Sequence, residues 1–173
     1  FSAAWSPNGQ QIAFVGNKEN ASDIYLYDLE NKTLINLTND IYSDSEPVWN
    51  PHGNSIAYVS SRDKSEKKLE DPDLHISKIT HFQTDIFTFD ISNNSSQRIT
   101  DTDANENYPA WAKTDNVMFY TSDESGISNL YRHGMDDDRV EPLTNILTGL
   151  FQISLSDDDE VMVFAGYSDN GWD

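Results

Sequence analysis

The stretch Trp5-Ser6-Pro7-Asn8-Gly9, followed by the apolar run Ile12-Ala13-Phe14-Val15, opens a unit that repeats along the chain. It returns as Trp49-Asn50-Pro51-His52-Gly53, as Trp111-Ala112-Lys113-Thr114-Asp115 and, without its tryptophan, as Leu155-Ser156-Asp157-Asp158-Asp159. The anchor positions are separated by 44 residues from 5 to 49, by 62 from 49 to 111 and by 44 from 111 to 155. A recurring period of this length indicates a repeat architecture in which each unit is one supersecondary motif.

The other apolar runs keep step with the anchors. Asp23-Ile24-Tyr25 begins 18 residues after Trp5, whereas the matching Asp85-Ile86-Phe87 begins 36 residues after Trp49. The second unit therefore carries one insertion, Ser65 to Phe82, which accounts for the longer interval. Three Leu-Thr or Ile-Thr pairs end at Thr38, Thr100 and Thr144, each eleven residues before the next anchor.

Each unit reads as four short strands separated by turn residues. In the first unit these are a strand ending in the tryptophan motif, then Ile12 to Val15, Ile24 to Tyr27 and Thr33 to Leu37. The Pro-Asn-Gly sequence suits a tight turn, and no window shows a sustained helical period, so we expect few helices. Four antiparallel strands in about 44 residues are typical of a β-propeller blade.

We therefore predict an all-β chain, a β-propeller fragment of four-stranded antiparallel blades, with three complete blades plus half of a fourth. As one partial propeller domain over 1–173, its blades are expected at about 2–39, 46–101 with insertion 65–82, 108–145 and, in part, 151–173. We expect the tryptophan anchors to pack between neighbouring blades. Since a closed ring usually has four to eight blades, we expect the chain to be a piece of a larger propeller.

Composition narrows the function classes. The net charge of −19 argues against nucleic acid, which attracts a basic surface, and against anionic lipid surfaces. No apolar run approaches the length of a membrane-spanning helix, so no direct membrane insertion is predicted for this piece. The absence of cysteine excludes disulfides and thiolate chemistry. We predict no cofactor.

The succession Ala-Trp-Ser-Pro-Asn-Gly, Ile-Ala-Phe-Val, Asp-Ile-Tyr-Leu-Tyr-Asp and Leu-Thr-Asn resembles the TolB-type (WD40-like, PD40) β-propeller repeat. The resemblance extends over essentially the whole chain, although Lys113-Thr114-Asp115 and Asp157-Asp158-Asp159 depart from the Pro-Asp-Gly turn. It implies one of three roles. These are a periplasmic protein-binding module as in TolB, a gate on a prolyl-oligopeptidase-like or tricorn-like peptidase, or a surface module beside an outer-membrane part.

Strand alternation places the loops after the second and fourth strands of each unit on one face. This loop face collects acidic residues, and the insertion projects from it with mixed charge. Long insertions are frequently functional, so we predict a protein partner here. The predicted partner-binding residues are Asp44, Glu46, Asp63, Lys67, Lys68, Asp103, Glu106, Tyr108, Asp123, Glu124 and Asp169.

Other chemistries find little support. Asp101-Thr102-Asp103-Ala104-Asn105 opens like a calcium loop, but Glu106 replaces the required glycine and Ala112 the required glutamate, which excludes an EF-hand. A weak divalent-cation site in this loop stays open, while turn capping by its side chains is the alternative. The four histidines are dispersed, so no zinc site or other metal site is predicted. The Asp-rich turns Asp136-Asp137-Asp138 and Asp157-Asp158-Asp159-Glu160, on the opposite face, are interpreted as solvated turns.

No nucleophile elbow or phosphate-binding glycine loop is present, so whether the chain belongs to an enzyme is uncertain, and no catalytic residue is assigned. We favour a non-catalytic protein-binding or scaffold propeller of the bacterial cell envelope. By resemblance only, its location would be periplasmic or outer-membrane-associated. The alternative is the propeller of a serine peptidase whose catalytic domain lies outside this chain. A polysaccharide-degrading propeller would need a histidine and metal cluster that these units do not show.

Overall fold

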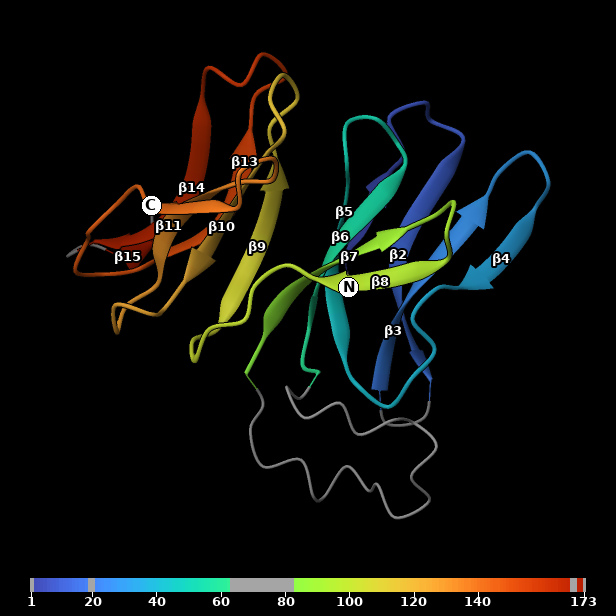
Figure 1. Ribbon diagram of the computed structural model, residues 1–173, viewed down its shortest axis with the longest axis horizontal. Coiled ribbons are helices and arrows are strands. Elements are labelled where there is room, and N and C mark those ends of the chain that lie inside the picture. The colour runs from blue at the N-terminus through green and yellow to red at the C-terminus, as the bar shows by residue number, and fades with distance from the viewer. Residues whose placement is uncertain (1, 19–20, 63–82, 169–170, 173) are drawn as a thin grey trace. The chain divides into compact units, whose positions relative to one another are not determined.

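The computed structural model describes residues 2–18, 21–62, 83–168 and 171–172, and in these ranges it contains strands and turns but no helix (Figure 1). The chain divides into two compact units, Phe1–Asp101 and Thr102–Asp173. The whole of the insertion, Ser65 to Phe82, lies outside the described residues. None of the described segments is a helix long and apolar enough to cross a membrane.

The first unit holds two four-stranded antiparallel sheets, each with its strands in chain order. The strands of the first sheet are β1 (Ala3–Trp5), β2 (Gln11–Lys18), β3 (Ala21–Asp28) and β4 (Thr33–Asn36). Those of the second are β5 (Asp44–Trp49), β6 (Ser55–Ser60), β7 (Asp85–Asp90) and β8 (Ser95–Arg98). Strand β5 packs against β1, β2 and β3, so the first strand of one sheet covers the face of the sheet before it.

The second unit repeats this arrangement with one complete and one shorter sheet. Its first sheet consists of β9 (Glu106–Trp111), β10 (Val117–Ser122), β11 (Asn129–Gly134) and β12 (Arg139–Pro142). Its second consists of β13 (Leu150–Leu155), β14 (Met162–Ser168) and β15 (Gly171–Trp172), and β13 packs against β9 and β10. The predicted fold class is confirmed, with three strands described in the last blade.

The anchor motif forms the hairpin turn between the first two strands of each sheet. The amide of Ser6 donates to the carbonyl of Gln11 at 2.9 Å, and Asn50 and Ser55 repeat the contact at 2.9 Å. Gly9 and Gly53 take φ values of 71° and 73°, a left-handed conformation that glycine adopts at little cost. This explains the glycine that stands four residues after the anchor in the first two blades.

Trp49 seals the two sheets of the first unit together. It is 6% exposed and packs with Ala13, Leu26 and Ile56. Its indole Nε1 donates to the carbonyl of Ala4 on the preceding sheet at 3.1 Å. The expected packing between blades is therefore present at this anchor. Trp5 holds the matching place in the first sheet and is 60% exposed, since the described residues include no sheet before it.

A pair of stacked aromatic rings joins the second and third strands of the three complete sheets. Their centroids lie 5.7–5.8 Å apart. The pairs are Phe14–Tyr25, Tyr58–Phe87 and Tyr120–Tyr131. Directly opposed aromatic residues stabilise an antiparallel pair beyond the area that they bury. They explain the aromatic residues that recur at these two positions.

The recurring threonine closes the start of the third strand. Its hydroxyl oxygen accepts the backbone N–H of Ile24, Ile86 and Leu130 at 3.0, 2.8 and 2.9 Å, in the three complete sheets. The donor lies at the entry of the third strand and the threonine just after the fourth. The contact therefore fixes the point at which the chain leaves each complete sheet and enters the loop that leads to the next sheet.

Candidate functional site

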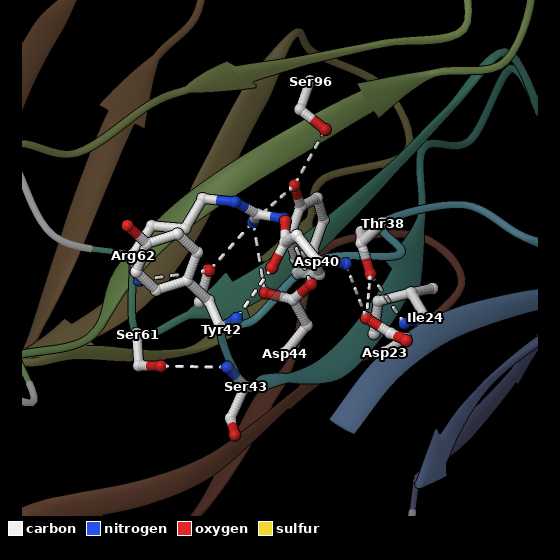
Figure 2. Close-up of polar contacts among 12 residues, drawn as sticks. Asp23, Ile24, Thr38, Asp40, Tyr42, Ser43, Asp44, Ser61, Arg62 and Ser96 are labelled. Atoms are coloured by element: carbon white, nitrogen blue, oxygen red, sulfur yellow. Dashed lines mark hydrogen bonds and ion pairs between the residues drawn. The ribbon is translucent and has the colours of Figure 1, made fainter. Parts of the chain in front are cut away.

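Arg62 is the centre of a polar cluster where the loop after β4 meets the end of β6 (Figure 2). Its guanidinium forms ion pairs with Asp40 and with Asp44, which are 6% and 0% exposed at their side chains. The loop carries both carboxylates into the junction of the two sheets, because Asp44 opens the buried strand β5. Arg62 itself keeps a side-chain exposure of 15%.

Both terminal nitrogens of the Arg62 guanidinium donate hydrogen bonds to more than one acceptor. Nη1 donates to Asp44 Oδ1 at 3.1 Å, to the Tyr58 hydroxyl at 3.0 Å and to Ser60 Oγ at 2.9 Å. Nη2 donates to Asp44 Oδ2 at 3.3 Å and to Asp40 Oδ2. A fork-shaped guanidinium suits this arrangement, which a lysine ammonium cannot reproduce.

Aromatic rings surround the guanidinium. The carbon Cζ of Arg62 lies 5.1 Å from the ring centre of Phe87 and 5.9 Å from that of Tyr42. Arg98 approaches the same Phe87 ring at 4.6 Å, pairs with Asp85 and donates to the backbone carbonyl of Arg62 at 3.1 Å. Cation–π contacts of this kind gain strength where water is excluded. Together they hold the backbone of Arg62 in place.

Asp23, at the entry of β3, adds a third carboxylate. One oxygen each from Asp23, Asp40 and Asp44 lies within 4.8 Å of the others. Asp23 accepts from Asn36 Nδ2 at 2.8 Å and, more weakly, from the Asp40 amide at 3.4 Å. Such spacing also occurs at cation sites, but the Arg62 guanidinium already pairs with two of the three carboxylates. We assign no metal ligand here.

Burial governs the protonation of this cluster. It raises the pKa of Asp44 to about 6, against the opposing influence of Arg62. Burial also raises the pKa of Tyr58 to about 12, so its hydroxyl keeps its proton and donates to Ser96 Oγ at 2.9 Å. For Arg62, burial opposes the charge, but Asp44, Tyr58 and Asp40 outweigh it and the net pKa shift is upward. The guanidinium is therefore always charged.

The third blade fills the equivalent place differently. Glu106, 62 residues after Asp44, is fully buried and accepts from Thr102 Oγ1 at 2.5 Å and from Ser122 Oγ at 3.0 Å. Asp123 accepts from the backbone and side-chain nitrogens of Asn105 at 2.7 and 2.9 Å. Thr102 and Asn105, two side chains of the loop considered for a weak cation site, thus serve these internal contacts.

The predicted partner-binding residues fall into three groups. Asp44 and Glu106 are buried inside the blades, whereas Asp103 and Glu124 are exposed and Glu46, Tyr108 and Asp123 are half-buried. Asp63, Lys67, Lys68 and Asp169 lie outside the described residues. The two buried carboxylates act within the fold, so the surface available to a partner comes from the other residues.

Glu46, Tyr108 and Gln152 share an unusual backbone conformation. Their φ values are 54°, 54° and 56°, and each lies three residues before its anchor. The strand register shifts at the same places, which marks a β-bulge. A left-handed conformation is costly for residues other than glycine, and a bulge re-aims the side chains next to it. The first strand of these blades thus presents side chains that an ideal strand would not.

Arg62 was not predicted as a site residue from the sequence. Its signal is that it is the first basic residue after a buried strand in a strongly acidic chain. The spacing of the repeat identified Asp44 but not its partner. That partner depends on a contact across 18 residues.

The interpretation of Asp157-Asp158-Asp159 as a solvated turn is wrong for Asp159. Its Oδ2 accepts the backbone N–H groups of Lys113 and Thr114 at 2.7 and 2.8 Å, and the Thr114 hydroxyl at 2.8 Å. Asp157 is exposed and pairs with Lys113. The turn therefore ties the last two blades together at their hairpin ends.

These geometries agree with one known repeat. Residues 1–67 match the family model PD40, described as the TolB beta propeller domain. This segment carries the TolB-type propeller repeat. No curated protein sequence matches it at a significant level.

Solved structures extend the likeness in fold beyond residue 67. TolB from Acinetobacter baumannii is 22% identical, with a TM-score of 0.71 over 95% of this chain and 37% of its own. The putative TolB from Agrobacterium tumefaciens is also 22% identical, with a TM-score of 0.77 over 96% of this chain and 53% of its own. A puromycin-hydrolyzing peptidase from Mycobacterium tuberculosis is 13% identical, with a TM-score of 0.64 over 97% and 29%.

At these identities the similarity establishes the fold alone. The chain spans 37% and 53% of the length of the two TolB structures. The functions of the longer proteins therefore do not carry over to this chain by similarity alone.

Proposed function

We propose that the chain is part of a non-catalytic propeller that binds a protein partner through its loop face. The observation that carries this proposal is the match of residues 1–67 to the TolB propeller domain. In the second unit, the bulge at Tyr108 and the exposed carboxylates of Asp103 and Glu124 support such a contact, and the first unit has a matching bulge at Glu46. The insertion 65–82 is proposed as a second contact. We also propose the blade boundaries that the sequence predicts, at about 2–39, 46–101, 108–145 and, in part, 151–173.

The charge of the exposed residues favours a partner with a basic surface. The chain carries 30 acidic against 11 basic residues, and opposite potentials accelerate and orient association. A location in the bacterial cell envelope, periplasmic or at the outer membrane, fits the TolB-type repeat and belongs to the same proposal.

The test is crosslinking of the full-length protein in cells, identification of the crosslinked protein, and titration of the two purified proteins. We expect the double substitution Asp103→Lys with Glu124→Lys to weaken the affinity by about tenfold, since two interfacial charges change sign. Deletion of 65–82 is expected to weaken it further. The loss should diminish at high salt, where surface charges are screened.

A matched control places the same charges in the hairpin turns at the opposite strand ends of the same unit. Asp115 and Glu160 are exposed in the hairpin turns after β9 and β13. Asp115→Lys with Glu160→Lys should leave the affinity within about twofold of the wild type. Equal losses from both pairs, or full affinity after both the loop-face substitutions and the deletion, would refute the proposed surface.

A peptidase propeller is the second candidate, because puromycin hydrolase has a TM-score of 0.71 with this chain at 10% identity. It predicts a catalytic serine elsewhere in the parent polypeptide. Labelling of the full-length protein by a fluorophosphonate probe, blocked by prior heating, would favour this candidate over the binding propeller.

A further inference from the structure

Asp23, Asp40 and Asp44 form a cluster of negative charge around Arg62. Within the described ranges, three carboxylates with oxygens within 4.8 Å of one another meet one guanidinium, that of Arg62. With all of them ionised the group has a net charge of −2 in a place where side chains are 0–6% exposed for Asp44 and Asp40. Like charges this close in a water-poor site disfavour full ionisation.

We propose that this cluster is a proton-operated latch on Arg62. When Asp44 is charged, the guanidinium is held between Asp40 and Asp44. When Asp44 takes up a proton, its ion pair with the guanidinium is lost and the guanidinium is left to Asp40, while the net charge of these four groups falls in magnitude from −2 to −1. The latch goes beyond partner binding and stands whether or not a partner docks on this face. Figure 2 shows the Arg62 side chain beside those of Asp40 and Asp44.

The groups around Asp44 support Asp44 as the proton acceptor. Asp23 faces it from the entry of β3, Asp40 from the preceding loop, and Tyr58 and Arg62 from β6 and its end. Beyond the Phe87 ring lie Asp85 on β7 and Arg98 on β8, which pair with each other. Of the three clustered carboxylates, Asp44 is the one with no exposed surface. The charged form of Asp44 therefore loses more hydration than that of Asp23 or Asp40.

The sign of the pH effect follows from the folded and unfolded pKa values. The pKa of Asp44 is about 6 in the fold against an ordinary 3.8. The folded state therefore binds this proton more tightly than the unfolded chain does. The stabilisation is fully present below 3.8 and is lost as the pH rises through 6. Asp28 and Asp90, in exposed turns, have lowered pKa values because backbone and side-chain groups donate to them, and they show the opposite sign.

The experiment is an NMR titration of the whole chain from pH 8 to 3, following the Asp44 side-chain carboxyl carbon and the Arg62 Nε–Hε group. We expect an Asp44 midpoint near 6, with the Arg62 signal moving at the same midpoint. Asp28 and Asp90 serve as internal references that titrate below 3.8. An Asp44 midpoint at or below about 4, or an Arg62 signal that stays fixed while Asp44 titrates, would overturn the latch.

Two variants separate the latch from the general effect of charge. Asp44→Asn imitates the protonated state, so the difference in urea midpoint between pH 5 and pH 7.5 should shrink relative to the wild type. Asp123→Asn removes one charge at a half-buried position of the other unit and should leave that difference unchanged. Equal shrinkage in both variants contradicts the proposal. Should Asp44→Asn not fold, the NMR midpoints of the wild type decide alone.

Added calcium distinguishes a proton site from a cation site. We expect millimolar Ca²⁺ to leave the Asp23, Asp40 and Arg62 signals in place at pH 7.5, because the guanidinium already pairs with Asp40 and Asp44. A saturable shift of all three signals would replace the latch by a metal site.

Discussion

Thr100 is one of three threonines whose side-chain hydroxyl accepts a backbone N–H at the start of the third strand. It is 4% exposed, and its Oγ1 accepts the amide of Ile86 at 2.8 Å. Without it, a buried N–H at the entry of β7 would lack that acceptor. The same contact at Thr38 and Thr144 explains why threonine is found at this position in all three complete blades.

Thr100→Val should therefore destabilise the protein by about 1–3 kcal/mol, the cost of an unsatisfied buried donor, with little change in shape. Thr88→Val, on the same strand β7, is the control and should change stability by less than about 1 kcal/mol. Urea denaturation at pH 7 measures both. Similar losses from the two substitutions would show that β-branched packing, rather than the hydroxyl, matters at residue 100.

Asp159 replaces the glycine of the anchor turn, and its contacts depend on a second replacement, that of a proline by Lys113 in the neighbouring blade. In the first unit Gly53 lies against Pro7, and a Cβ added to Gly53 would lie 3.6 Å from the proline ring. At the matching places Lys113 replaces the proline and Asp159 the glycine. Because lysine has the N–H that proline lacks, the carboxylate has a donor to bind.

Two substitutions at Asp159, which has a φ of 59°, separate the carboxylate contacts from the backbone strain. Asp159→Gly loses the contacts but relieves the left-handed conformation, whereas Asp159→Ala loses the contacts and keeps the strain. We expect both to lower the thermal midpoint, alanine more than glycine. The loss should fade as the pH falls below 3.8, since hydrogen bonds from Thr114 lower the pKa of Asp159. A glycine variant less stable than the alanine variant would contradict this account.

At the scale of the element, β2 and β3 pack tightly because of Gly16. A Cβ on Gly16 would lie 2.6 Å from ring atoms of Tyr25, so the glycine makes room for the ring. That ring stacks on Phe14 at a centroid distance of 5.8 Å. Gly166 is at the same position in β14, and a Cβ added there would meet no atom within 4 Å. A glycine at the same position of two blades therefore has a crowded environment in β2 and an open one in β14.

Gly16→Ala should cost about 1–3 kcal/mol through overpacking, whereas Gly166→Ala should change stability by less than about 1 kcal/mol, or raise it slightly. Chemical denaturation of the two variants, side by side, is the measurement. Equal effects would mean that the Tyr25 ring moves aside freely. In that case the aromatic pair does not hold β2 and β3 together.

At the scale of the whole molecule, the net charge of −19 opposes the folded state through self-repulsion. Raising NaCl from about 0.01 M to about 0.1 M shortens the screening length from about 30 Å to about 10 Å. We expect the thermal midpoint to rise by about 2–4 °C, which for this size corresponds to about 1 kcal/mol. KCl should act equally, because screening depends on ionic strength. A midpoint that falls with added salt would show that ion pairs such as Arg62 with Asp44 outweigh the repulsion.

The repeat spacing was sufficient to predict the blades because strand alternation and turn chemistry are local. The Trp49 anchor and the left-handed Gly9 and Gly53 can be recognised from a few neighbouring residues. The sequence also placed Asp103 and Glu124 on exposed loops. It could not separate them from Asp44 and Glu106, since acidic residues beside a strand end look alike whether they face water or the next sheet.

By itself the sequence determined the period, the fold class and the strongly acidic character, because each depends on residue type and spacing along the chain. Only the tertiary structure decided that Asp44 meets Arg62, that Asp159 caps the turn of another blade and that Glu46 and Tyr108 occupy bulges. The physical reason is that burial and pairing arise when sheets pack on one another. Those contacts join positions between 18 and 46 residues apart, which no local pattern encodes.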